Sequence, residues 1–132
     1  MKYSIFFVFT FCVSLHAQLS VTISTPQVTG QKAVVSLAMT NRLAEPVESA
    51  RAICFLLDGQ GKMVGQTAKW VIGGSKDRPA LEPKQGSSYN LVITSPQPLT
   101  TTNLTAKVTF SQIILTGGKP VDVRQSVVVQ QR

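Results

Sequence analysis

Histidine and cysteine, the side chains that most often catalyse reactions or bind transition metals, are scarce in this sequence. His16 is the only histidine, and Cys12 and Cys54 are the only cysteines. His16 and Cys12 both lie in a leader that we expect the exported protein to lose. Without His16, a Ser-His-Asp triad cannot form, and Cys54 lacks both an imidazole partner and a second strong zinc ligand. We therefore expect no enzyme, and no cofactor or metal site.

The remaining polar residues offer only weak alternatives for catalysis or nucleotide binding. Ser75-Lys76 is a serine-lysine pair, but it lacks the Ser-x-x-Lys spacing on a helix. Gly59-Gln60-Gly61 resembles the start of a nucleotide-binding loop, but predicted strands rather than a helix flank it. Asp58 is explained by its place in a predicted hairpin turn, and the other carboxylates are scattered along the chain. No two of them therefore stand out as the pair of carboxylates that a glycosidase needs.

Residues 1–17 have the organisation of a secretory signal peptide. Lys2 supplies a positive start, residues 5–13 form an apolar run, and Ala17 precedes the predicted cut. A membrane anchor or a buried first strand is the alternative, but a spanning helix needs roughly 20 apolar residues. We expect a signal peptide at 1–17, one domain at 18–132 without a transmembrane segment, and a secreted or periplasmic bacterial protein.

Positive charge is in excess, with 13 Lys and Arg against 6 Asp and Glu, a net charge of +7. The cations are spread singly along the chain, which is typical of a soluble protein with a weak attraction to anionic surfaces. The alternative is a face that binds a polyanion. Specific nucleic-acid binding is not expected, because aromatic residues are few and, Trp70 apart, alternate like core residues.

Alternation of apolar and polar residues predicts about seven β-strands. The alternating or apolar segments are 19–24, 35–40, 48–57, 62–72, 88–94, 104–115 and 121–129. The apolar parity shifts around Gln112, which predicts a β-bulge, and Gly117-Gly118 predicts a two-residue hairpin. We expect an all-β, antiparallel, two-sheet sandwich of immunoglobulin type, with a barrel of similar strand count as the alternative.

The chain is organised around a hairpin that joins segments 48–57 and 62–72 through the turn Asp58–Gly61. The first segment is apolar at both parities, with Ala52, Cys54 and Leu56 in one set and Ile53, Phe55 and Leu57 in the other. Such a run is typical of a strand covered on both faces. A loop or another molecule would cover its outer face. Cys54 is expected as a buried thiol, with an intermolecular disulfide as the alternative.

Two places are candidates for contact with a partner. Residues 73–86 form a long aperiodic segment that carries Lys76, Arg78 and Lys84. Loops on rigid sandwich domains commonly bind other molecules. We therefore predict that this loop and the free strand edges contact an unknown protein or a second copy of the chain. We expect the Trp70 side chain to lie in the core, because tryptophan is usually largely buried. The alternative is that it is an exposed aromatic residue that binds a partner. Asn103-Leu104-Thr105 has the form of a glycosylation sequon, which matters only in a eukaryote.

Two short motifs resemble a pattern of secreted bacterial domains. They are Phe55-Leu56-Leu57-Asp58-x-x-Gly61-Lys62-Met63-Val64 and Leu81-x-Pro83-x-x-Gly86-Ser87-Ser88-Tyr89. Over about 28–95 they resemble the FxLYD-type immunoglobulin-like family, although Leu57 replaces its Tyr and Cys54 its Phe. The resemblance implies a sandwich and no catalytic residues. We predict an exported, non-catalytic module for protein binding or envelope assembly, or alternatively a charge-driven binder of anionic envelope polymers or surfaces.

Overall fold

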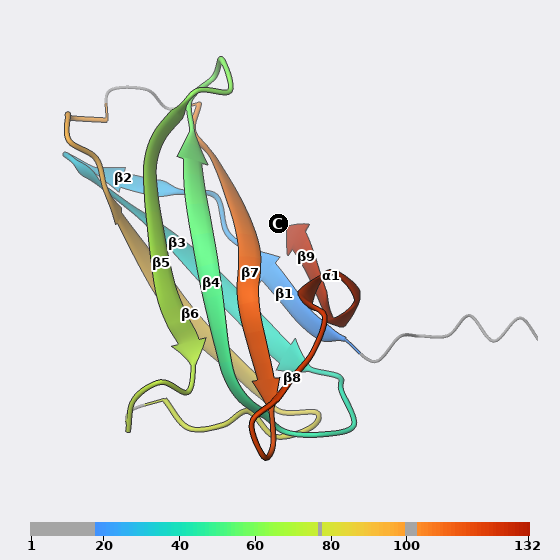
Figure 1. The fold of residues 1–132 in the computed structure, drawn as a ribbon. Helices are drawn as coiled ribbons and strands as arrows, with labels where there is room; N and C mark the ends of the chain where they lie inside the picture. The colour runs from blue at the N-terminus through green and yellow to red at the C-terminus, as the bar shows by residue number, and fades with distance from the viewer. Residues whose placement is uncertain (1–17, 77, 100–102) are drawn as a thin grey trace, which may run out of the picture.

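The computed structural model describes residues 18–76, 78–99 and 103–132, so the predicted signal peptide lies outside it. The regular structure of the described chain is β apart from one short helical turn, in two sheets packed face to face around one core (Figure 1). The all-β, two-sheet prediction is therefore confirmed. The structure has nine strands in the described residues rather than about seven.

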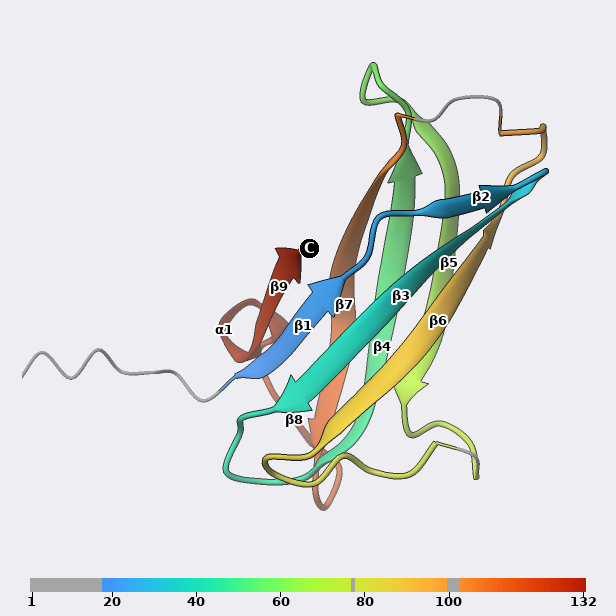
Figure 2. The same ribbon diagram turned by 180° about the vertical axis from the view of Figure 1, so that it is seen from behind.

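The first sheet is centred on strand β3. Its members are β1 (Leu19–Ile23), β2 (Gln27–Thr29), β3 (Lys32–Asn41), β6 (Gly86–Thr94) and β9 (Val127–Gln131). Strand β6 pairs along one edge of β3, while β1 and β2 follow one another along the other edge (Figure 2). Strand β9 pairs with β1 in parallel, so the sheet is mixed and the expectation of purely antiparallel pairing was wrong.

The second sheet is centred on β4. It has the order β5 (Met63–Ile72), β4 (Val47–Leu57), β7 (Thr105–Leu115) and β8 (Lys119–Pro120), with every neighbour antiparallel. The hairpin of β4 and β5 is the one predicted around Asp58–Gly61. Asp58 Oδ1 accepts hydrogen bonds from the backbone N–H groups of Gln60 and Lys62, both at 2.9 Å. Of the two turn glycines, only Gly61 has a positive φ, +80°.

The core consists of the inward-facing side chains of both sheets. Its fully buried members include Val21, Val35, Leu37, Leu56, Leu91 and Ile113. Fully burying one large apolar side chain stabilises a fold by about 1.5–3 kcal/mol, which is why the alternation in the sequence predicts the strands well. The two sheets approach closely at Gly65, where a Cβ atom would lie 2.8 Å from Ile93 Cγ2.

Two departures from the predicted strands have local causes. Strand β2 was not predicted, because all three of its residues are exposed and leave no alternation. Of the predicted strand 121–129, only residues 127–129 are strand, as the start of β9, because residues 123–126 form a single helical turn, α1 (Val123–Ser126). Asp122 caps this turn, because its Oδ1 accepts a hydrogen bond from the Arg124 N–H at 2.9 Å.

The two features predicted near the end of β7 had different outcomes. The β-bulge is confirmed, because Arg51 pairs with Gln112 and Ala52 with Phe110, which leaves Ser111 as the extra residue. The two-residue hairpin was wrong. Leu115 pairs with Lys119, so three residues form the loop, and its two glycines have φ values of +82° and +76°.

Candidate functional site

The predicted loop cations do not form one cluster. Lys76 and Lys84 are exposed, but Arg78 is half-buried. Arg78 Nε donates a hydrogen bond to the Gly73 carbonyl at 3.0 Å, and its guanidinium carbon lies 5.8 Å from the centroid of the Tyr89 ring. Arg78 therefore fastens the loop to strand β6 through a cation–π contact. Binding of a partner by this loop stays a prediction.

A cleft of about 360 Å³ lies beside Arg78, between the end of β5 and the start of β6. Its walls include Val71, Ile72, Leu81 and Tyr89, with Arg78 as the charged lining residue. Neither Lys76 nor Lys84 lines it. The cleft therefore has both apolar and polar walls, since Gln85, Ser87 and Ser88 also line it, and its lining cation Arg78 already has two contacts.

The far end of the same loop is held by Asn41, a residue that the sequence reasoning missed. Asn41 is fully buried, and its Nδ2 donates to the carbonyls of Glu45 at 3.0 Å and Leu81 at 2.9 Å. Its Oδ1 accepts from the Leu43 N–H at 2.9 Å. Lys84, which has a positive φ of +67°, donates its N–H to the Asn41 carbonyl. These bonds tie both loops at this end of the sandwich to β3.

The second set of apolar side chains on β4 faces away from the core. Ala52, Cys54 and Leu56 are fully buried, whereas Ile53, Phe55 and Leu57 are only partly covered. None of these last three belongs to the core or to the partly buried side chains that pack against it. They lie on the solvent side of the sheet, which we call the outer face.

Cross-strand pairing defines the rest of the outer face, because directly paired residues project to the same side of a sheet. On β5 the partners of Arg51, Ile53, Phe55 and Leu57 are Trp70, Ala68, Gln66 and Met63. On β7 they are Gln112, Thr109, Lys107 and Thr105. A shallow groove of about 370 Å³ runs between β4 and β5, lined by Arg51, Ile53, Phe55, Gln66, Thr67 and Ala68.

Trp70 lies on the outer face instead of in the core. It is half-buried, it pairs with Arg51, and it is absent from the side chains that pack against the core. A Cβ atom added at Gly74 would lie 2.8 Å from Trp70 Cβ, so the chain after β5 folds back closely on this residue. The favoured core placement is thus not what the structure shows. Trp70 is a partly accessible aromatic residue. It lies at the edge of the apolar stripe formed by Ile53, Phe55 and Leu57.

No strand, helix or loop of the described chain lies over the middle of the outer face, which is turned toward the viewer in Figure 1. Of the two coverings that the sequence left open, a loop of the described residues is therefore ruled out there. The face is also positively charged. Arg51 and Lys107 lie on it, and the two ion pairs within the described residues, Lys119–Glu45 and Arg124–Asp122, lie elsewhere.

Cys54 lies on the inner side of β4 and is a free, buried cysteine, as predicted. Burial raises the pKa of its thiol from 9.0 to about 11, because the thiolate loses its hydration in the core. The described residues contain no group of three or more His, Cys, Asp and Glu side chains placed to hold a metal ion. None of their helices is long and apolar enough to cross a membrane.

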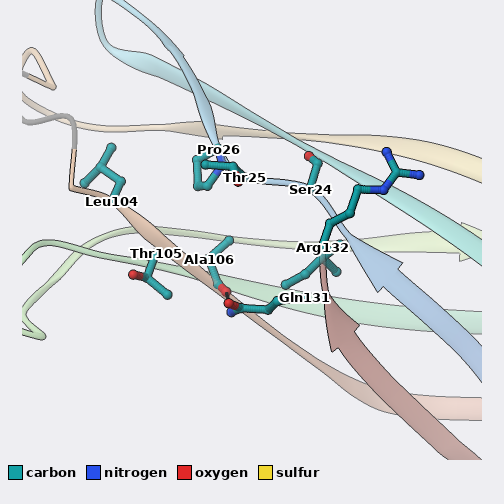
Figure 3. Close-up of a pocket in the computed structure, with 9 residues that line it drawn as sticks. Ser24, Thr25, Pro26, Leu104, Thr105, Ala106, Gln131 and Arg132 are labelled. Atoms are coloured by element: carbon teal, nitrogen blue, oxygen red, sulfur yellow. Dashed lines mark hydrogen bonds between the residues drawn. The ribbon is translucent and has the colours of Figure 1, made fainter.

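A small pocket of about 70 Å³ lies where the two sheets meet at the end of β9 (Figure 3). Gln131 Nε2 donates a hydrogen bond to the Ala106 carbonyl at 3.0 Å, and the Arg132 N–H donates to the Ile23 carbonyl at 3.0 Å. The Arg132 side chain points away from Gln131 and Ala106 (Figure 3). The first bond joins β9 to β7 across the two sheets, and the second joins the end of β9 to β1, so the pocket is part of the contact that closes this end of the sandwich.

Comparisons with known proteins show the fold and nothing more specific. No protein-family model matches the sequence, and no curated protein matches it. Among solved structures, the chain is similar to a crystal structure from Bordetella pertussis described as a candidate ApaA protein. The TM-score is 0.54 at 20% identity, over 79% of this chain and 86% of that one.

Proposed function

We propose that this protein is an exported, non-catalytic β-sandwich module that binds another protein through its outer face. The observation that carries the proposal is strand β4, which is apolar on both sides although only one side has a second sheet against it. A sheet with one solvated face ordinarily alternates apolar with polar residues. Covering Ile53 and Phe55 removes apolar area from water, which is favourable by about 25 cal/mol per Å².

The residue types on the outer face favour a protein over a small ligand. Phe55, Trp70 and Arg51 belong to the classes enriched at protein interfaces, and Trp and Arg are frequent energetic hot spots. The groove along them is shallow and lies on a sheet, whereas small-molecule sites are concave and enclosing. The outer face therefore suits a broad partner surface better than a pocket ligand.

Export and the immunoglobulin-like fold belong to the same proposal. Residues 1–17 have the signal-peptide pattern, which supports a secreted or periplasmic location. The pairing of β3 with β6 in one sheet and of β4 with β7 in the other supports an immunoglobulin-type arrangement. The turn at Asp58–Gly61 agrees with the FxLYD-type resemblance. The short helical turn α1 before the last strand departs from the simplest form of that fold.

A photo-crosslinking residue at Gln66 tests the proposal, because this exposed position lies on the outer face without belonging to its apolar stripe. We expect one discrete protein adduct in the producing cell, and its loss when Phe55→Ser is added. Val92 is the matched control position, since it is 47% exposed on the other sheet. Equal adducts from positions 66 and 92, or none from position 66, would refute the proposal.

The alternative, a charge-driven binder of anionic polymers, is favoured by the net charge of +7 and by exposed Lys76 and Lys84. It predicts retention on heparin that falls steeply as salt rises, because binding then depends on counterion release. It also predicts that Phe55→Ser leaves retention unchanged. Flat retention across the salt range would remove this alternative.

A further inference from the structure

We infer that the protein segment covering the outer face is acidic and extended, with two carboxylates that flank an apolar side chain. This inference rests on the proposed function and names the chemistry of the partner. It follows from the spacing of Arg51 and Lys107, from the lack of carboxylates in the cross-strand rows that contain them, and from the apolar residues between them.

The spacing of the two cations matches the repeat of an extended chain. Lys107 pairs with Phe55, which is four residues after Arg51 on β4. At about 3.3 Å per residue, the two cations lie about 13 Å apart along the strands and one strand spacing apart across them. Residues i and i+4 of an extended peptide project to the same side at the same separation. Residue i+2 then lies over Ile53, between the two cations.

The charge of the face determines which side chains the partner presents there. The four cross-strand rows from Arg51 to Leu57 contain two cations and no carboxylate. Arg51 is already half-buried, and its contact with Ser111 Oγ is long, at 3.5 Å. A covering layer removes the remaining water from Arg51, which costs free energy unless a carboxylate pairs with it. An acidic segment supplies that pairing with charge-assisted hydrogen bonds.

A second copy of this chain does not meet these requirements. A two-fold dimer through the outer face would place the Arg51 and Lys107 side chains of both copies in one interface without a carboxylate between them. An anionic polymer would satisfy the charges but leave Ile53 and Phe55 without an apolar partner. The combination of apolar stripe and flanking cations therefore favours an acidic protein segment.

Selection from a displayed library of extended nine-residue peptides tests this inference on the folded protein. We expect enrichment of Asp or Glu at positions i and i+4 around an apolar residue at i+2. Labelled peptides from the selection are then titrated against the variants by fluorescence anisotropy. Arg51→Gln with Lys107→Gln is expected to weaken binding about tenfold or more, which corresponds to about 1.4 kcal/mol or more.

The matched control is Lys32→Gln with Arg42→Gln, which removes one lysine and one arginine from exposed positions outside the outer face. This control is expected to bind the peptides as the unmodified protein does. Equal weakening in both double variants would show a response to net charge alone and would overturn the inference. Enrichment of neutral or basic peptides, or no enrichment over scrambled sequences, would overturn it as well.

The variant Phe55→Ser separates failure of the inference from failure of the proposed function. Some peptides could lose binding to the Phe55→Ser variant but keep it to the Arg51→Gln, Lys107→Gln double variant. That result would refute the inference of an acidic partner segment, but the outer face would still be a binding surface. Peptides insensitive to both would refute both proposals. A homodimer dissolved by Phe55→Ser would assign the face to a second copy and so overturn the inference. Heparin retention sensitive only to the charge variant would assign the face to a polyanion and would overturn the inference too.

Discussion

Replacing Asn41 by leucine should destabilise the fold by about 2–3 kcal/mol, because the change removes three side-chain hydrogen bonds worth about 1 kcal/mol each. The Leu81 carbonyl keeps a second donor, the Val47 N–H at 2.9 Å, so its loss is the smallest. The Leu43 N–H loses the partner that holds the loop after β3, and this loss accounts for most of the expected effect.

Urea unfolding, followed by the fluorescence of the single tryptophan, measures this change. With about 1–3 kcal/mol per molar urea for a small domain, a loss of about 2–3 kcal/mol lowers the midpoint by about 0.7–3 M. Asn41→Asp should be worse at pH 7, because it places a carboxylate against two carbonyl oxygens. Burial raises the pKa of that new carboxyl in the folded state, so the deficit should shrink as the pH falls and the carboxyl again donates a hydrogen bond.

The control is Asn90→Asp, at an exposed position on β6 where Asn90 Oδ1 accepts from Ser36 Oγ at 2.8 Å. This substitution should change stability by less than about 0.5 kcal/mol and should not regain stability at low pH. If Asn41→Leu unfolds within about 0.5 kcal/mol of the unmodified protein, the buried hydrogen bonds of Asn41 do not hold the loops. The account of how these loops are tied to the sandwich would then be wrong.

Three further predictions follow from single positions. The Cys54 thiol should resist thiol reagents in the native protein at pH 8 and react fully in urea. Because the folded pKa is about 11 against 9.0 for the exposed thiol, stability should fall as the pH rises from about 9 to 11, and Cys54→Ala should abolish this loss. Phe55→Ser should lower the free energy of unfolding by less than about 1 kcal/mol, whereas Leu56→Ala should lower it by about 2–5 kcal/mol. Equal losses in urea unfolding would show that the two faces of β4 are misassigned. Gly65→Ala should cost about 1–3 kcal/mol through its clash with Ile93, and the cost should shrink in an Ile93→Ala background; a double-mutant cycle without coupling would refute the close approach.

The strands that the sequence predicted are those with one buried face. In β3, Val35, Leu37 and Met39 are buried while Ser36 and Ala38 are exposed, and this contrast is what alternation reports. Asn41 continues the buried parity, so a polar residue in register with core positions was the available signal for its role. Alternation does not report partners, and the parallel pairing of β9 with β1 joins segments more than a hundred residues apart.

The candidate site was predictable in part. The double apolar pattern of β4 was visible as Ile53 and Phe55 beside Cys54, and only the fold shows that the outer set has no layer over it. The loop cations were chosen by composition, which does not distinguish a cation facing solvent from one packed on an aromatic ring. Arg78 reaches Tyr89 because the loop returns alongside β6, an approach set by the pairing of β6 with β3.

Arg51 and Lys107 also act against self-association of the uncovered outer face. An exposed hydrophobic patch on a flat sheet promotes association with any similar surface. Two cations that flank the patch make such self-association unfavourable, because identical faces would bring like charges together as they lose water. The same cations favour a partner with carboxylates at the matching spacing. One pair of side chains thus acts against the wrong occupant and for the right one, which is how charge confers specificity on a surface whose affinity is mainly hydrophobic.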